Sequence, residues 1–253
     1  MAAKHGDSPG KRVRFPGFFF LLAGIILTLP LSSSAQTMDP IKENVLIPGG
    51  EFLMGAGDGG RTEQPVHSIW LDAFYLDRTE VPNAVYETFD PAYRRSRQSA
   101  CDRCPATRLS WFDADAFCRS RGKRLPTEAE WEKAARGPRG WDYSFAATAD
   151  LSKGRFGRSL TAGPVTVDAL EPNGYGLHNM SGNVWEWVNG WFDETYYQNS
   201  PPRNPKGPGE GFRKIVRGGS WYNAAYYVHT GMRFGLEPHV KLASLGFRCA
   251  RDS

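Results

Sequence analysis

Residues 217–249 read RGGSWYNAAYYVHTGMRFGLEPHVKLASLGFRC. Each end of this stretch is a compact motif, Arg217-Gly218-Gly219-Ser220-Trp221 at the start and Gly246-Phe247-Arg248-Cys249 at the finish. Between them there is no cysteine, and residues 119–248 contain none at all. The two ends therefore indicate a structural frame, whereas the residues inside it offer no thiolate for nucleophilic or soft-metal chemistry.

Residues 1–35 have the composition of a secretory signal peptide. Basic residues precede an apolar run over residues 18–31, and the small residues at 32–35 supply a cleavage site before Gln36. A retained membrane anchor is the alternative, but a span needs roughly 20 apolar residues. We therefore expect an exported protein, periplasmic or extracellular, that touches a membrane only through this segment if it is not cleaved.

The charge of the chain argues against nucleic acid as a partner. The precursor carries a net charge of +4, but residues 1–35 contain four Lys or Arg and one Asp. Their removal leaves 27 basic and 26 acidic residues, a net charge of about +1, with no basic cluster of the kind that binds phosphates. We expect residues 36–44 to form a linker and residues 45–253 to form one domain.

The chain has four cysteines, and export predicts that they form two disulfides. Spacing alone leaves all three pairings open. The Cys101-Asp102-Arg103-Cys104 segment is ambiguous by itself, because a CxxC can be a local disulfide, a redox pair or half of a zinc site. Zinc would need two further ligands at suitable spacing, and the pair precedes Pro105 in a loop rather than opening a helix.

Local patterns predict few regular elements. Two apolar runs around Pro48-Gly49-Gly50 predict a hairpin over residues 45–55, and residues 67–77 read as a strand leading into a helix near 82–89. Helices are predicted over 110–121 and 127–136, because each begins with a capping-box spacing and is followed by glycine, Gly122 or Gly137. After Gly137 the composition predicts loops with short strands, a type of domain that needs disulfides or bound ions for stability.

Several segments, in order, resemble the sulfatase-modifying factor family, whose type member is the formylglycine-generating enzyme. They cover about residues 45–251: IPGGEFLMG at 47–55, Ser110-Trp111 with Asp113-Ala114, GKRLPTEAEWE at 122–132, PNGYGL at 172–177, Asn179, GNVWEW at 182–187 and the two terminal motifs. The resemblance implies an α+β fold of the divergent C-type lectin-like kind, with little regular secondary structure. It also implies a structural bond between Cys118 and Cys249. For Cys101 and Cys104 we expect a local structural disulfide, with a redox pair or half of a metal site as the alternatives.

The resemblance further implies a calcium site in residues 179–186. It assigns as ligands the side chain of Asn179, the carbonyls of Gly182 and Val184, and the carboxylate of Glu186. Oxygen donors from a tight glycine-containing loop suit this hard cation. The alternative is a simple turn before a buried Trp185.

The family's groove positions correspond to Ser220, Trp185 and Arg233. Asn223 and Val228 stand roughly where its oxidases carry two copper-binding thiols, which makes Asn223 a fourth groove candidate. Neither residue is a ligand for copper(I), so we expect no copper. An iron or copper site built from histidines, as in a non-haem metal oxidoreductase, is the alternative; surface or turn positions are the simpler expectation for His67, His178, His229 and His239.

Two functions follow as hypotheses. The first is an exported protein that binds, or helps to mature, an exported protein, peptide or small-molecule partner without copper–thiolate chemistry. The second is a formylglycine-generating oxidase that converts the cysteine of a sulfatase Cys-x-Pro-x-Arg segment. The first is favoured because the frame is present and the reactive thiols are not.

Overall fold

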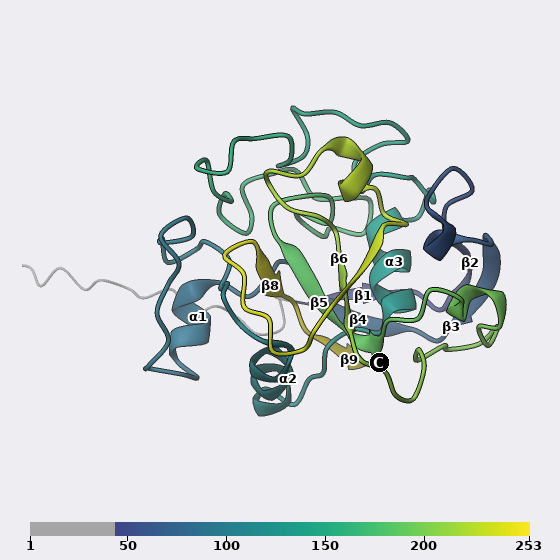
Figure 1. The fold of residues 1–253 in the computed structure, drawn as a ribbon, viewed down its shortest axis with the longest axis horizontal. Helices are drawn as coiled ribbons and strands as arrows, with labels where there is room; N and C mark the ends of the chain where they lie inside the picture. The colour runs from purple at the N-terminus through teal and green to yellow at the C-terminus, as the bar shows by residue number, and fades with distance from the viewer. Residues whose placement is uncertain (1–43) are drawn as a thin grey trace, which may run out of the picture. The chain divides into compact units, whose positions relative to one another are not determined.

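The computed structural model describes residues 44–253, and Figure 1 shows their arrangement. The expected signal peptide and linker lie outside the described residues, apart from the linker's last position, Asn44. Three small sheets contain all the strands of the described part, and short helices lie around them. In this part of the chain no helix has both the length and the hydropathy needed to span a bilayer.

The largest sheet has four strands in the order β7-β6-β5-β8. It consists of β7 (Arg233–Leu236), β6 (Lys214–Arg217), β5 (Trp185–Trp191) and β8 (Leu245–Phe247). The pairs β7–β6 and β6–β5 are antiparallel, whereas β5 and β8 run parallel, with Trp185 opposite Leu245. The two ends of the 217–249 stretch therefore lie on either side of β5, and this stretch contributes β7, β8 and the last residue of β6 to the sheet.

The other two sheets involve the N-terminal part of the described chain. One has the order β1-β4-β9, from β1 (Asn44–Ile47), β4 (Phe74–Asp77) and β9 (Ala250–Asp252), and the other pairs β2 (Gly50–Met54) with β3 (His67–Leu71). The predicted hairpin is therefore wrong, because β1 and β2 are both strands but pair with different partners. The single strand predicted over residues 67–77 is two strands, and Asp72 and Ala73 separate them.

The helices follow the local signals more closely. α2 (Trp111–Ser120) and α3 (Glu128–Arg136) both begin with complete capping boxes, at Ser110 with Asp113 and at Thr127 with Glu130. The predicted helix near 82–89 is confirmed only as the short α1 (Asn83–Glu87). Single turns of 3-10 helix complete the set: η1 (Arg61–Glu63), η2 (Tyr196–Gln198) and η3 (Ala225–Val228).

Loops occupy residues 137–184, as the composition predicted, and they form the upper teal and green part of Figure 1. Two apolar cores support them. Trp131 of α3 lies in the core that β1 to β4 share, and Trp187 of β5 lies in the core that packs against α1 and α2. Because β5 also contributes Val188 to the first core, this strand joins the two cores.

All four cysteines are in disulfides. Cys118 of α2 bonds Cys249, at a sequence separation of 131, and Cys101 bonds Cys104, at a separation of 3. Cys118 and Cys249 are fully buried in the second core, so their bond ties α2 to the C-terminal end of the chain.

The two bonds should differ in their effect on stability. In the loop-entropy description, opening the long loop by replacing Cys118 and Cys249 with serine should cost about 5 kcal/mol, against about 2 kcal/mol for Cys101 and Cys104. For a domain of this size each kcal/mol lowers the melting temperature by on the order of 2 to 4 degrees. Calorimetry of the two double variants checks this, and equal losses would contradict it.

Candidate functional site

Three of the four predicted groove residues converge on one side-chain oxygen. Asn223 Oδ1 accepts hydrogen bonds from the Ser220 hydroxyl at 2.6 Å, the Ser220 amide at 3.0 Å and Trp185 Nε1 at 3.1 Å. Trp185 comes from β5, and the other two residues come from the loop between β6 and η3. Because Oδ1 accepts all three bonds, the amide N–H2 of this half-buried side chain is left to donate to a ligand.

Backbone geometry explains why this loop brings the residues together. Gly218 and Gly219 have φ angles of 90° and 72°, in the left-handed region that favours glycine. A side chain at Gly219 would lie 2.5 Å from the Tyr227 carbonyl oxygen, so the loop returns closely upon itself. Val228, the second position where a thiol was considered, is fully buried.

Arg233, the fourth candidate, makes its polar contacts elsewhere. Its guanidinium donates to Glu128 at 2.8 and 2.9 Å and to the carbonyls of Thr62 and Asp193 at 2.8 and 3.1 Å. It also lies 4.1 Å from the ring centre of Tyr197. Arg233 is therefore part of a buried ionic network and is not bonded to Asn223 or its partners.

The predicted calcium loop contains an unpartnered oxygen. Asn179 is 6% exposed, yet its Oδ1 has no hydrogen-bond partner. Its Nδ2 donates to Glu80 Oε2 at 3.1 Å and to the Val167 carbonyl at 3.0 Å. Asn179 and Gly182 both have positive φ, at 60° and 98°, which turns the chain tightly between them.

Glu186, the predicted acidic ligand, faces a buried arginine. Arg248 donates to its Oε1 at 2.7 Å and to its Oε2 at 2.8 Å, and Trp131 Nε1 donates to Oε2 at 2.8 Å. Arg248 and Glu186 are 0% and 1% exposed, so this is an ion pair removed from water. A carboxylate has about four lone-pair positions, so these three bonds do not exhaust it.

Sequence reasoning missed Glu80. This fully buried residue accepts from Asn179 at 3.1 Å and from Asn183 Nδ2 at 2.8 Å, and it lies 3.8 Å from Arg248. Burial raises the pKa of Glu80 to about 7, and the charge of Glu186 adds to the shift while that of Arg248 opposes it. The sequence contains no signal for it, because Glu80 comes from outside the loop and meets it only in the folded chain.

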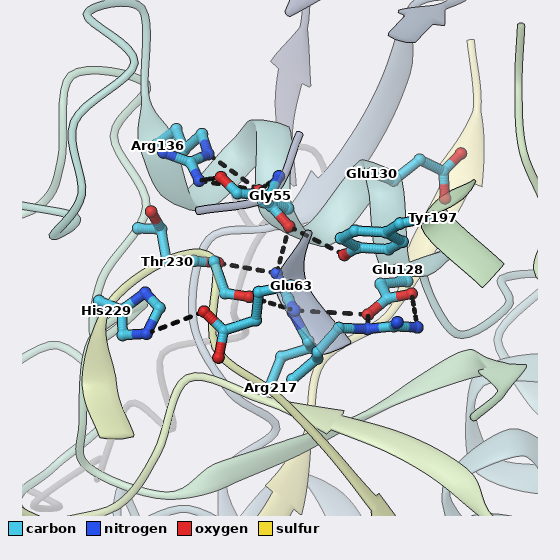
Figure 2. Close-up of polar contacts among 12 residues, drawn as sticks. Gly55, Glu63, Glu128, Glu130, Arg136, Tyr197, Arg217, His229 and Thr230 are labelled. Atoms are coloured by element: carbon cyan, nitrogen blue, oxygen red, sulfur yellow. Dashed lines mark hydrogen bonds and ion pairs between the residues drawn. The ribbon is translucent and has the colours of Figure 1, made fainter. Parts of the chain in front are cut away.

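A second buried network surrounds Arg217 (Figure 2). Arg217 Nη2 donates to Glu132 Oε2 at 2.6 Å and to the Thr230 carbonyl at 2.7 Å, and Nη1 lies 3.4 Å from Glu128 Oε1. Arg136 and the Gly55 amide donate to the other oxygen of Glu132, at 3.0 and 2.8 Å.

This network holds the start of the β6–η3 loop. Arg217 is the last residue of β6, and the glycine pair and Ser220 follow it directly. The signal that could have revealed the network is the arginine after Ile215-Val216, since a charged residue that ends a buried strand needs an opposite charge.

Comparisons with known proteins agree with this architecture. Residues 30–253 match the family model described as "Sulfatase-modifying factor enzyme 1-like domain". The formylglycine-generating enzyme of Streptomyces coelicolor is 34% identical over 83% of this chain and 89% of its own. The chain belongs to the sulfatase-modifying factor family.

Two further proteins are similar to this chain. The solved structure of Treponema denticola variable protein 1 matches with a TM-score of 0.75 and 25% identity, over 83% of this chain and 95% of its own. A mouse protein named inactive C-alpha-formylglycine-generating enzyme 2 is 29% identical over 94% of this chain and 96% of its own. The expected α+β, divergent C-type lectin-like fold is confirmed.

The buried network makes a prediction about stability. Burial raises the pKa of Glu132, but the charges of Arg217 and Arg136 lower it more, and the net pKa lies below its ordinary value. Replacing Glu132 with alanine removes the carboxylate that two buried guanidinium groups share and leaves each with only a longer carboxylate contact, to Glu128 at 3.4 Å or Asp142 at 3.3 Å, which should cost about 3 kcal/mol of unfolding free energy. Urea denaturation of the purified variant measures it.

Glu194→Ala is the matched control. Glu194 lies 3.6 Å from Arg213 in an exposed pair, so its loss should leave the denaturation midpoint unchanged. Equal midpoints for Glu132→Ala and the wild type would contradict the role of the network.

Proposed function

We propose that this chain is an exported member of the sulfatase-modifying factor family that binds, or helps to mature, an exported partner without copper–thiolate chemistry. The observation that carries the proposal is that all four cysteines are in disulfides, while Asn223 and buried Val228 stand at the positions considered for thiols. The partner would be a protein, a peptide or a small molecule. Two disulfides are consistent with an oxidising compartment.

Asn223 is the residue that would meet the partner. Its Oδ1 is fixed by Ser220 and Trp185, so its N–H2 group is held in one orientation without the need to order the side chain on binding. Exposed rings stand on η3, directly after this loop, since Tyr226 and Tyr227 are 50% and 44% exposed. A fixed donor beside aromatic surface suits a peptide or glycan-like ligand better than a reactive substrate.

Replacing Asn223 with alanine should weaken capture of the partner, because it removes the donor and releases Ser220 and Trp185. The test immobilises the wild type and this variant and exposes both to the exported fraction of the native cells. Species retained by the wild type and lost from the variant are identified by mass spectrometry. Asn199→Ala, an exposed asparagine outside the loop, should retain the same species as the wild type.

The similarity to formylglycine-generating enzymes supports a second candidate, an oxidase that acts on a sulfatase Cys-x-Pro-x-Arg segment. Incubation of the chain with such a peptide, copper(I) and oxygen distinguishes the two. We expect the peptide mass to stay unchanged. The mass loss that accompanies conversion of a thiol CH2SH into an aldehyde would overturn the proposed function, as would equal capture by the Asn223 variant and the wild type.

We propose in addition that residues 179–186 hold a structural calcium ion. Asn179 Oδ1 supports this, because it is a buried oxygen that lacks a hydrogen-bond partner. The carbonyls of Gly182 and Val184 and the remaining lone pair of Glu186 would complete a set of oxygen donors. The ion would supply positive charge to a region where Glu80 and Glu186 lie close together, as the effect of Glu186 on the pKa of Glu80 indicates.

Removing calcium should then lower the melting temperature. An ion present at a hundredfold excess over its Kd stabilises the native state by about 2.7 kcal/mol. For a domain of this size, each kcal/mol changes the melting temperature by on the order of 2 to 4 degrees. Asn179→Ala and Glu186→Gln should each abolish the calcium increment, which is the difference in melting temperature between the protein with calcium and the protein with a chelator. Because Glu186 also pairs with Arg248, the increment is the measured quantity and not the absolute melting temperature.

Ser181→Ala is the control for the calcium site. Its hydroxyl accepts from the Ser144 amide at 3.0 Å and is not among the proposed ligands, so this variant should keep the full calcium increment. If chelation leaves the wild-type melting curve unmoved, the loop is only a turn.

A further inference from the structure

A cavity of about 260 Å³ opens beside η3, and neither Asn223 nor its partners Ser220 and Trp185 are among the residues that line it. Asp58 and Gly59 line one side, Asp142 and Tyr143 line another, and Tyr226 and His229 close it from η3 and the residue after it. These segments come from three separate parts of the chain. The cavity is smaller than the usual pockets for drug-sized molecules, so it suits a small ligand.

The lining is acidic. Asp58 and Asp142 are its carboxylates, and no lysine or arginine is among the residues that line it. Asp142 is partly balanced by Arg136, whose Nη1 lies 3.3 Å from Asp142 Oδ1, but the Asp142 side chain is 60% exposed. Asp58 is exposed as well. The lining therefore carries an excess of negative charge that a cation would offset.

A third carboxylate lies behind this lining. Glu63 is 1% exposed, its Oε2 accepts no hydrogen bond, and that oxygen lies 3.2 Å from His229 Nε2 (Figure 2). A side chain at Gly59 would collide with the same oxygen, so only glycine there leaves it room. Glu63 Oε2 thus sits between two residues of the cavity lining, Gly59 and His229. An unpartnered buried carboxylate oxygen is costly unless a ligand or proton completes it.

The aromatic residues add a second attraction. Tyr226 is half exposed, and its ring centre lies 5.7 Å from that of His229, while the Tyr143 ring stacks on Phe145 at 5.9 Å. The faces of such rings attract cations, most strongly where water is excluded. The rings also give apolar surface, which a bare metal ion does not use.

We propose that this cavity is a binding site for a small organic cation, an ammonium or guanidinium group on a compact apolar body. Asp58 and Asp142 face the charge, Glu63 adds a buried carboxylate behind Gly59 and His229, and Tyr143 and Tyr226 cover the body. The volume supports an organic ligand, because a water-sized ion needs only about 30 Å³. This site does not depend on the function proposed for Asn223.

Protonation of Glu63 gives the site a pH signature. Burial raises the pKa of Glu63 to about 7; Glu132 adds to the shift, whereas a backbone bond from Gly60 and the charges of Arg217 and Arg233 oppose it. Burial, with the charges of Arg217 and Arg136, lowers the pKa of His229, while Glu132 and Asp58 oppose this. As the pH rises through about 7, Glu63 therefore becomes negative, and the lowered pKa of His229 means that its charge is lost at a lower pH than usual, so the affinity for a cation should rise.

The test is isothermal titration calorimetry of the full chain with benzylamine, its neutral analogue benzyl alcohol, and calcium chloride. Benzylamine should bind to one site and more tightly at pH 8 than at pH 6, and benzyl alcohol should bind at least tenfold more weakly. Glu63→Gln, which keeps the shape of the side chain, should remove the pH dependence and weaken binding severalfold, because it removes a negative charge that lies behind the cavity wall.

Substitutions of exposed aspartates give a second test, which holds even if the Glu63 variant fails to fold. Asp58→Asn and Asp142→Asn should each weaken benzylamine binding severalfold, whereas Asp102→Asn, outside the cavity in an exposed pair with Arg95, should leave it unchanged. Equal binding of benzylamine and benzyl alcohol would overturn the proposal. So would displacement of benzylamine by calcium at equal concentration, or unchanged affinity in both exposed aspartate variants.

Discussion

Two buried arginine–glutamate pairs hold this fold together. Arg217 pairs with Glu132 of α3, and Arg248 pairs with Glu186 of β5, and all four side chains are almost completely buried. A buried charge without its partner costs several kcal/mol, so each arginine requires the segment around it to meet one particular glutamate. The motifs at the two ends of residues 217–249 each contribute one of these arginines. They are therefore anchors that set the position of the loops beside them.

The groove and the cavity both depend on the first anchor. Arg217 ends β6, and the turn at Gly218 and Gly219 begins immediately after it, so the position of the guanidinium sets where Ser220, Asn223 and η3 lie. The loop before η3 presents the amide of Asn223, and Tyr226 of η3 closes an acidic cavity together with His229. A loop whose ends are fixed by buried charges can vary in its exposed residues without loss of the fold, which suits a binding protein.

The second anchor bears on the proposed calcium loop. Glu186 is shared among Arg248, Trp131 and the proposed ion, and Glu80 lies beside it. Within this cluster two carboxylates face one guanidinium, so the negative charge is only partly balanced. An additional cation would lower the pKa of Glu80 and bring the cluster nearer to neutrality. The disulfide between Cys118 and Cys249, next to Arg248 in the chain, holds the same region from the side of α2.

The sequence by itself determined the elements whose causes are local. α2 and α3 begin where their capping boxes stand, because Ser110 and Thr127 satisfy backbone amides within one turn. The family motifs gave the fold class, and the missing thiols were visible without coordinates. The Cys118–Cys249 pairing, implied by resemblance alone, is present in the structure.

Tertiary structure decided what depends on residues far apart in the chain. β1 and β2 are close in sequence, yet β1 pairs with β4 and β2 with β3, because the pairing of a strand follows the core it covers and not the turn beside it. Glu80, Glu132 and Glu63 acquire their roles from partners 99, 85 and 166 positions away, Asn179, Arg217 and His229. Charge pairing in a buried site is set by three-dimensional proximity, which no local pattern of residues encodes.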